Sequence, residues 1–350
     1  MTAVTLRLVE IALPFRRPFT ISKATVRSRR TVLVGLGDGT PWGWGEAAPC
    51  PGITDEEPAE VWDAMRDAAG DIIGGGPVDL PPTAAAAIDQ ARWDLSSRQA
   101  GESLTVQLGG MPGPVPACAA VGLTDTIGEL LDVVAEVAGR GVRCVKLKIK
   151  PGWDLEPLRA VLDAFEGLRV GVDANGAYAD PHDPVLGLVD SLGPMYIEQP
   201  LPADDLGGHA FLRSRLDSPL CLDESVGSVR QAHMAIEAGA ADIISIKPGR
   251  IGLTGSKEVH DLANDAGLSV KATGLLESGI GRAHTIAVGC LPSVTHHDLA
   301  PTDWYFAADV ADRPFVLEDG LVLPPTTPGI GVTVSEAALA DLAVRESELV

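Results

Sequence analysis

The chain has few basic residues for its length. It carries 27 Lys and Arg against 48 Asp and Glu, which gives a formal net charge of −21. A nucleic-acid backbone or an anionic membrane surface would be repelled by this charge, and no clustered basic stripe offsets the repulsion. We therefore expect neither partner, and we expect the ligand to be a small molecule.

Cysteine and long apolar runs are also scarce. The five cysteines are widely spaced and form no Cys-x-x-Cys or Cys/His pattern with the spacing of a zinc site. No apolar run approaches the ~18 residues that cross a bilayer. The first residues lack the order of basic, apolar and small residues found in a secretory signal. These absences predict reduced thiols in a soluble, cytoplasmic protein.

Hydrophobic patterning divides the chain into three parts. Residues 1 to about 60 alternate apolar and polar residues like strands, and residues 58–107 follow a helical period, which predicts an α+β domain over 1–112. Over 113–312, eight short runs rich in Val, Ile and Leu alternate with helical stretches, the pattern of a parallel α/β barrel. Residues 313–350 return to strand and turn character, and we expect them to rejoin the first domain.

Charged residues stand at the ends of five successive runs. They are Lys148, Asp173, Glu198, Asp223 and Lys247, separated by 25, 25, 25 and 24 residues. Each alone is more typical of a helix cap or a solvated side chain. Five of them at the period of one β/α unit predict a ring of charges, because the active site of such a barrel forms at the C-terminal ends of its strands.

The three carboxylates of this ring would repel one another unless a cation lay between them. Oxygen ligands favour a hard divalent ion, Mg²⁺ first and Mn²⁺ second, over zinc. We therefore predict a metal site formed by Asp173, Glu198 and Asp223.

Lysines are expected to face the same site. In "VKLKIK", strand alternation points Lys146 and Lys148 into the barrel mouth and the apolar residues between them toward the helices. Lys247 lies four units later, which is the opposite wall of an eight-stranded barrel. A lysine base beside a cation suits removal of a proton α to a carboxylate, because the developing negative charge is stabilised.

These motifs resemble those of the enolase superfamily, in its muconate-lactonizing-enzyme-like subgroup. The matching segments are "VKLKIKPG", "VDAN", "IEQP", "LDES" and "SIKPGRIG", in the same order and with similar separations. The resemblance implies a (β/α)₇β TIM-like barrel over 113–312, a capping domain over 1–112 and a segment over 313–350 that rejoins the cap. It also allows a homo-oligomer.

Within the subgroup, "KLKIKPGWD", "LLESGIGRA" and "PFVLEDGLVLPPTTPGIGV" resemble o-succinylbenzoate synthases of the branch that includes N-succinylamino acid racemases. The resemblance implies that Lys148 takes the α-proton of 2-succinyl-6-hydroxy-2,4-cyclohexadiene-1-carboxylate and returns it to the departing hydroxyl, while Lys247 stabilises the enediolate. This dehydration belongs to menaquinone biosynthesis. Racemisation of an N-succinylamino acid or another N-acylamino acid uses the same two lysines, so these residues do not separate the two reactions.

Other readings stay open. "APCPGITDEE" resembles dipeptide epimerases, but "VTHHDLAPTD" lacks the Asp-x-Asp pair that would bind a dipeptide's ammonium group. A muconate cycloisomerase-like activity belongs to the same subgroup. The segments "GRIGLTG" and "KATGLLESG" depart from the pattern of many relatives where loops would face the substrate, which weakens any assignment of the substrate. A non-catalytic binding protein ranks last, because none of the five charged residues is lost.

Weaker candidates surround the predicted site. Asn175 would face the same way as Asp173 on an extended strand, although a turn residue is nearly as common there. Asp298 would form a salt bridge to a lysine, with Glu277 as the other candidate. The amide of Gly279 would bind a succinyl carboxylate at a helix start. We expect Lys146, Asn175, Gly279 and Asp298 to contact the substrate, and we predict either a lid or a solvated loop for the basic residues 15–30.

Overall fold

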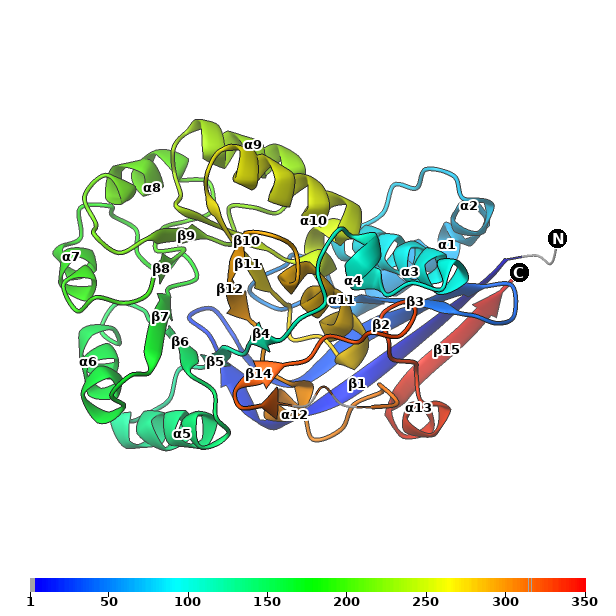
Figure 1. Ribbon diagram of the computed structural model, residues 1–350, viewed down its shortest axis with the longest axis horizontal. Helices are drawn as coiled ribbons and strands as arrows, with labels where there is room; N and C mark the ends of the chain where they lie inside the picture. The colour runs from blue at the N-terminus through cyan, green and yellow to red at the C-terminus, as the bar shows by residue number, and fades with distance from the viewer. Residues whose placement is uncertain (1–3, 314, 316) are drawn as a thin grey trace.

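The computed structural model describes residues 4–313, 315 and 317–350, arranged as a barrel beside a smaller α+β unit (Figure 1). The barrel occupies the left of the view and the smaller unit the right, where both ends of the chain also lie. None of the helices formed by the described residues is both long enough and apolar enough to cross a membrane.

The smaller unit is a four-stranded antiparallel sheet covered by helices. Its sheet order is β15-β1-β2-β3. Its N-terminal elements are β1 (Thr5–Thr20), β2 (Thr25–Gly37), β3 (Gly43–Ala47), α1 (Pro58–Asp67), α2 (Ala69–Gly74), α3 (Pro82–Ala100) and α4 (Leu104–Gln107). Helix α3 crosses β3 so closely that a Cβ at Gly45 would collide with the carbonyl oxygen of Ala87. Glycine at this position therefore sets how deeply the helix packs on the sheet.

The barrel confirms the predicted (β/α)₇β architecture. Its eight strands follow chain order around the sheet, and every neighbouring pair is parallel. The strands are β5 (Ala119–Val121), β6 (Cys144–Lys148), β7 (Arg169–Asp173), β8 (Ile197–Glu198), β9 (Leu220–Leu222), β10 (Ile243–Ile246), β11 (Ser269–Thr273) and β12 (Val294–Asp298). The helices between them are α5 (Ile127–Gly139), α6 (Leu155–Ala164), α7 (Pro184–Asp190), α8 (Leu206–Arg213), α9 (Val229–Glu237), α10 (Pro248–Asp265) and α11 (Gly279–Gly289).

The first of the eight predicted runs, "VPACAAVG" at residues 115–122, gives only a short barrel strand. Strand β4 (Val115–Pro116) leaves the barrel and pairs with β14 (Leu321–Val322), which in turn pairs with β13 (Leu317–Glu318). Proline has no N–H to donate to a ladder, so it is tolerated at such an edge and not inside the barrel sheet. Only residues 119–121 join the barrel.

The C-terminal part contains a helix that the strand and turn pattern did not predict. Its remaining elements are α12 (Thr302–Tyr305), α13 (Glu336–Leu342) and β15 (Ala343–Leu349). Ser335 precedes helix α13, and its hydroxyl caps the helix by accepting a hydrogen bond from the amide of Ala338 (3.3 Å). Strand β15 then pairs antiparallel with β1, as the tail was expected to do.

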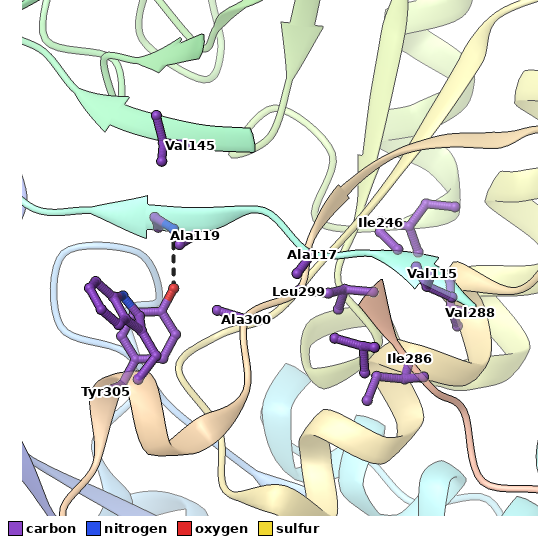
Figure 2. Packing of buried hydrophobic residues seen from close by; sticks show 14 of the residues in the cluster. Val115, Ala117, Ala119, Val145, Ile246, Ile286, Val288, Leu299, Ala300 and Tyr305 are labelled. Atoms are coloured by element: carbon purple, nitrogen blue, oxygen red, sulfur yellow. Dashed lines mark hydrogen bonds between the residues drawn. The ribbon is translucent and has the colours of Figure 1, made fainter. Parts of the chain in front are cut away.

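The main apolar core lies between the barrel strands and their helices, and it extends to the segments that close the barrel (Figure 2). Val145 and Ile246 belong to barrel strands, while Ile286 and Val288 come from α11. Tyr305 packs in the same core, and its hydroxyl accepts a hydrogen bond from the amide of Ala120 (3.2 Å). Strand alternation thus leaves the inner face of the barrel to the charged residues.

Candidate active site

Three carboxylates converge at the C-terminal ends of neighbouring barrel strands. Asp173 and Glu198 are the last residues of β7 and β8, and Asp223 follows the last residue of β9. Each contributes one carboxylate oxygen to a group whose members all lie within 4.8 Å of one another, and all three residues are buried. Asp173 is paired with Glu198 in the sheet register, so both side chains leave the sheet at one level.

Lysines pair with each of these carboxylates. Lys148 Nζ lies 2.6 Å from Asp173 Oδ2, and Lys247 forms an ion pair with Asp223. Lys148 ends β6, whereas Lys247 directly follows β10 and precedes α10. Strands β6 and β10 are separated by β7, β8 and β9, so the two lysines approach the carboxylates from different sides of the barrel.

A pocket opens between these lysines. Lys148, Lys247 and Asp223 line its barrel side, and Phe19 and Ile53 of the smaller unit line its outer side. The outer residues belong to segments that cover the barrel mouth, so a ligand in this pocket would contact both units of the protein.

The arrangement matches a known superfamily. A family model described as enolase C-terminal domain-like matches residues 129–338. An o-succinylbenzoate synthase from Geobacillus kaustophilus is 35% identical over 346 residues, which cover 93% of this chain and 92% of the relative. An N-succinylamino acid racemase from Amycolatopsis sp is 37% identical over 350 residues, covering 95% and 94%.

The chain belongs to the enolase superfamily. A solved structure of a superfamily member from Listeria innocua superposes with a TM-score of 0.91 at 27% identity, covering 100% of this chain and 99% of that one. A muconate lactonizing enzyme from Pseudomonas fluorescens shares the fold with a TM-score of 0.90 at 21% identity, covering 98% and 100%. The protein is therefore an enolase-superfamily enzyme.

Lys146 lies among the carboxylates of this superfamily site. Its Nζ is 3.0 Å from Asp173, 3.3 Å from Glu198 and 2.7 Å from Asp298. Burial lowers the pKa of Lys146, but Asp298, Glu198 and Asp173 outweigh burial and hold the pKa well above the usual lysine range. These three carboxylates therefore favour the protonated form of Lys146.

The three carboxylates differ in how easily they ionise. Burial raises the pKa of each, but Lys148 and Lys146 bring that of Asp173 below its usual range, and Lys247 brings that of Asp223 to about 2. For Glu198, burial and the neighbouring Asp173 raise the pKa to about 7. A divalent cation fits this donor set, because it would neutralise three buried oxygen ligands at once.

The predicted substrate contacts divide into two groups. Lys146 and Asp298 line the pocket, whereas neither Asn175 nor Gly279 is among the described residues that line it. The amide of Gly279 was expected to be open to a substrate carboxylate, but it donates to both carboxylate oxygens of Asp309 (2.9 and 3.1 Å). The structure thus does not bring Gly279 to the pocket.

Asn175 faces the site from a turn and not from an extended strand. Its φ of 48° is in the left-handed region, which asparagine tolerates better than most residues. Its side chain accepts a hydrogen bond from Lys148 (2.8 Å) and donates one to Glu224 (2.8 Å). Its backbone N–H donates to Asp173 (2.9 Å). Asn175 therefore helps to orient both a predicted base and a predicted ligand.

Residues 15–30 are not a loop. They form the ends of β1 and β2, joined by a tip at residues 21–24. The carbonyl oxygen of Thr20 accepts a hydrogen bond from the amide of Leu123 (2.8 Å), which ties this hairpin to the barrel mouth. The side chain of Phe19 thereby reaches the pocket.

Three buried charged residues near the site were not anticipated. Lys271 contacts Glu198 from within the barrel. Arg282 of α11 lines the pocket and donates a hydrogen bond to the carbonyl oxygen of Asp298 (3.1 Å). Burial raises the pKa of Glu224, whose carboxylate accepts the hydrogen bond from Asn175. Alternation in "SVKATG" places Lys271 on the same strand face as Thr273, so the sequence did contain a sign of its orientation.

Proposed function

We propose that this enzyme dehydrates 2-succinyl-6-hydroxy-2,4-cyclohexadiene-1-carboxylate to o-succinylbenzoate, with Mg²⁺ held by Asp173, Glu198 and Asp223. The observation that carries the proposal is the pocket itself, which has a lysine on each side and three buried carboxylates beside it. The o-succinylbenzoate synthase from Geobacillus kaustophilus, which this chain resembles over 93% of its length, supports this choice of substrate.

Lys148 would act as the base and then as the acid. As a neutral amine it takes the proton from the carbon α to the carboxylate, and the same ammonium then returns that proton to the departing hydroxyl. The C–H and C–O bonds break, a new C=C bond completes the aromatic ring, and water leaves. In the structure Lys148 contacts Asp173, so it exchanges this partner for the substrate when the site is loaded.

Lys247 would stay protonated on the other side of the substrate. Its positive charge then stabilises the enediolate electrostatically without moving a proton. The bound metal would supply further positive charge for the substrate carboxylate. Lys146 keeps its charge between Asp173, Glu198 and Asp298, where it orients the carboxylates and does not transfer protons.

The second candidate is racemisation of an N-succinylamino acid. Lysines on both sides of one pocket favour it, because a proton removed by one can be replaced from the other face. The relative from Amycolatopsis sp named N-succinylamino acid racemase supports it equally well by sequence. A dipeptide epimerase is less favoured, because Ala300 stands where the second residue of an Asp-x-Asp pair starting at Asp298 would lie.

The deciding measurement is the ultraviolet absorbance change when enzyme and Mg²⁺ are added to the cyclohexadiene substrate. We expect turnover that EDTA abolishes and added Mg²⁺ restores. Absence of turnover by folded, metal-loaded enzyme would rule out the dehydratase. Racemisation of N-succinylamino acids, followed by polarimetry, tests the second candidate on the same preparation.

Lys247→Arg separates the two roles of Lys247. Arginine keeps the positive charge but is not a base at neutral pH. We expect dehydration to fall less than racemisation in this variant, since only racemisation needs proton transfer at residue 247. Equal losses in both reactions would contradict the purely electrostatic role in dehydration.

A further inference from the structure

A fourth lysine lies beside the predicted metal ligands. Lys271 of β11 is 0% exposed, and its ammonium forms an ion pair with Glu198 Oε2. The other carboxylate oxygen, Oε1, lies 3.3 Å from Lys146 Nζ. Glu198 is thus held by two lysines, one on each oxygen.

The surroundings of Lys271 form an enclosed site. The ammonium lies 5.0 Å from the ring centroid of Tyr196, within range of a cation–π contact. That ring has room because residue 171 is glycine, where a Cβ would lie 2.6 Å from the nearest ring atom. The ring of Tyr196 therefore covers the buried ammonium of Lys271.

Lys271 is separated from the pocket, unlike the other lysines of the site. Lys146, Lys148 and Lys247 line the pocket, where a substrate or a metal can take over their carboxylate partners. Lys271 is not one of the described residues that line the pocket. A substrate in this pocket would therefore have no direct contact with Lys271.

The ammonium of Lys271 lies directly against the carboxylate of Glu198. A positive charge so close to a ligand carboxylate stabilises that carboxylate when no metal is bound. It also repels a divalent cation on the same carboxylate, because screening is weak in a buried site.

We propose that Lys271 is a buried counter-ion for Glu198, which stabilises the metal-free protein and weakens metal binding so that the ion remains exchangeable. The proposal rests on the metal site of the proposed function. It makes Lys271 a positioning residue, since it acts through Glu198 and touches neither substrate nor pocket.

The test is metal affinity combined with thermal stability in Lys271→Gln and Lys271→Met. Mn²⁺ affinity is measured from the electron paramagnetic resonance signal of the free ion, and Tm is measured in EDTA and in saturating Mn²⁺. Glutamine keeps a hydrogen-bond donor for Glu198 and removes only the charge, whereas methionine removes both. Lys257→Gln on α10, where the lysine side chain is 39% exposed, is the matched control for loss of one surface charge.

We expect both variants at residue 271 to bind Mn²⁺ more tightly than wild type, by at least about tenfold in Kd, since one nearby repulsive charge is gone. Their Tm in EDTA should fall, and saturating Mn²⁺ should restore most of the loss. Lys257→Gln should match wild type in both measurements.

Contrary results have distinct meanings. An unchanged Kd in Lys271→Gln with weaker binding in Lys271→Met would show that orientation and not charge matters, and would overturn the proposal. An unchanged Tm in EDTA would overturn it too, as would failure of both variants to fold with Mn²⁺ present. If wild type itself bound no Mn²⁺, the metal-dependent function would fail, while the Tm in EDTA would still report on the contact between Lys271 and Glu198.

Discussion

Buried charges are stabilised differently at the barrel mouth and at the junction between the two units. At the mouth, carboxylates and lysines pair with each other, as Lys148 does with Asp173. At the junction, Arg29 donates hydrogen bonds to the carbonyl oxygens of residues 48, 49, 275 and 276, and no carboxylate pairs with it among the described residues. An ion pair between two side chains can be replaced by contacts with a ligand. Backbone carbonyl partners, in contrast, cannot move away.

Glu46 is a buried negative charge at the same junction, and it too has backbone partners. Its fully buried carboxylate accepts hydrogen bonds from the amides of Ser278 and Gly281, at the start of α11. The partially positive N-terminus of a helix offsets part of the cost of burying such a carboxylate. The mouth is therefore suited to rearrangement during a reaction, and the junction to holding the pocket-lining segment 274–276 in place.

Lys148→Ala should have the largest effect, because it removes the base from the mouth. We expect turnover to fall by between about a hundredfold and ten thousandfold, with the far-ultraviolet circular dichroism spectrum unchanged and metal still bound. Lys150→Ala, an exposed lysine two residues along, is the control and should stay near wild type. Substantial turnover in Lys148→Ala would contradict the mechanism.

Arg29→Met should disrupt the junction. Four backbone carbonyls would lose a buried charged donor, and we expect the free energy of unfolding to fall by at least about 3 kcal/mol. Because Leu275 and Leu276 line the pocket, KM should rise more than kcat falls. Arg27→Met, at an exposed position on the same strand, should change neither quantity. A fall in kcat with unchanged KM would contradict a role for Arg29 in holding the pocket-lining segment 274–276.

Glu46→Gln should give the smallest effect, and one that depends on pH. Burial raises the pKa of Glu46 above 4.5, and the hydrogen bonds from Ser278 only partly lower it. With a raised folded-state pKa, the stabilisation that the protonated carboxyl contributes is present below pH ~4.5 and is lost as pH rises through the folded-state value.

In urea unfolding, we therefore expect Glu46→Gln to be less stable than wild type by about 1 kcal/mol at pH 4.5. This difference should shrink as pH rises to 8, because glutamine does not titrate. The exposed Glu348→Gln on β15 of the same sheet is the control. A difference that grew with pH would mean that the ionised carboxylate is the form stabilised at the start of α11.

Sequence patterns alone were enough to predict the barrel and its ring of charges. Strand alternation and the repeat of about 25 residues place Asp173, Glu198 and Lys148 inward and at one level, and both patterns are local properties of the chain. The same reasoning would have oriented Lys271 correctly, but not its ion pair with Glu198. That contact joins residues 73 positions apart.

The partners of the other buried charges depend on contacts between distant parts of the chain. Glu46 meets Ser278 across 232 residues, and Arg29 meets Leu276 across 247. Asn175 lies in a left-handed turn, and Asp309 takes the amide of Gly279, because packing between distant segments fixes these conformations. Local periodicity specifies which face a side chain occupies, whereas the partner that stabilises a buried charge depends on how distant elements pack together.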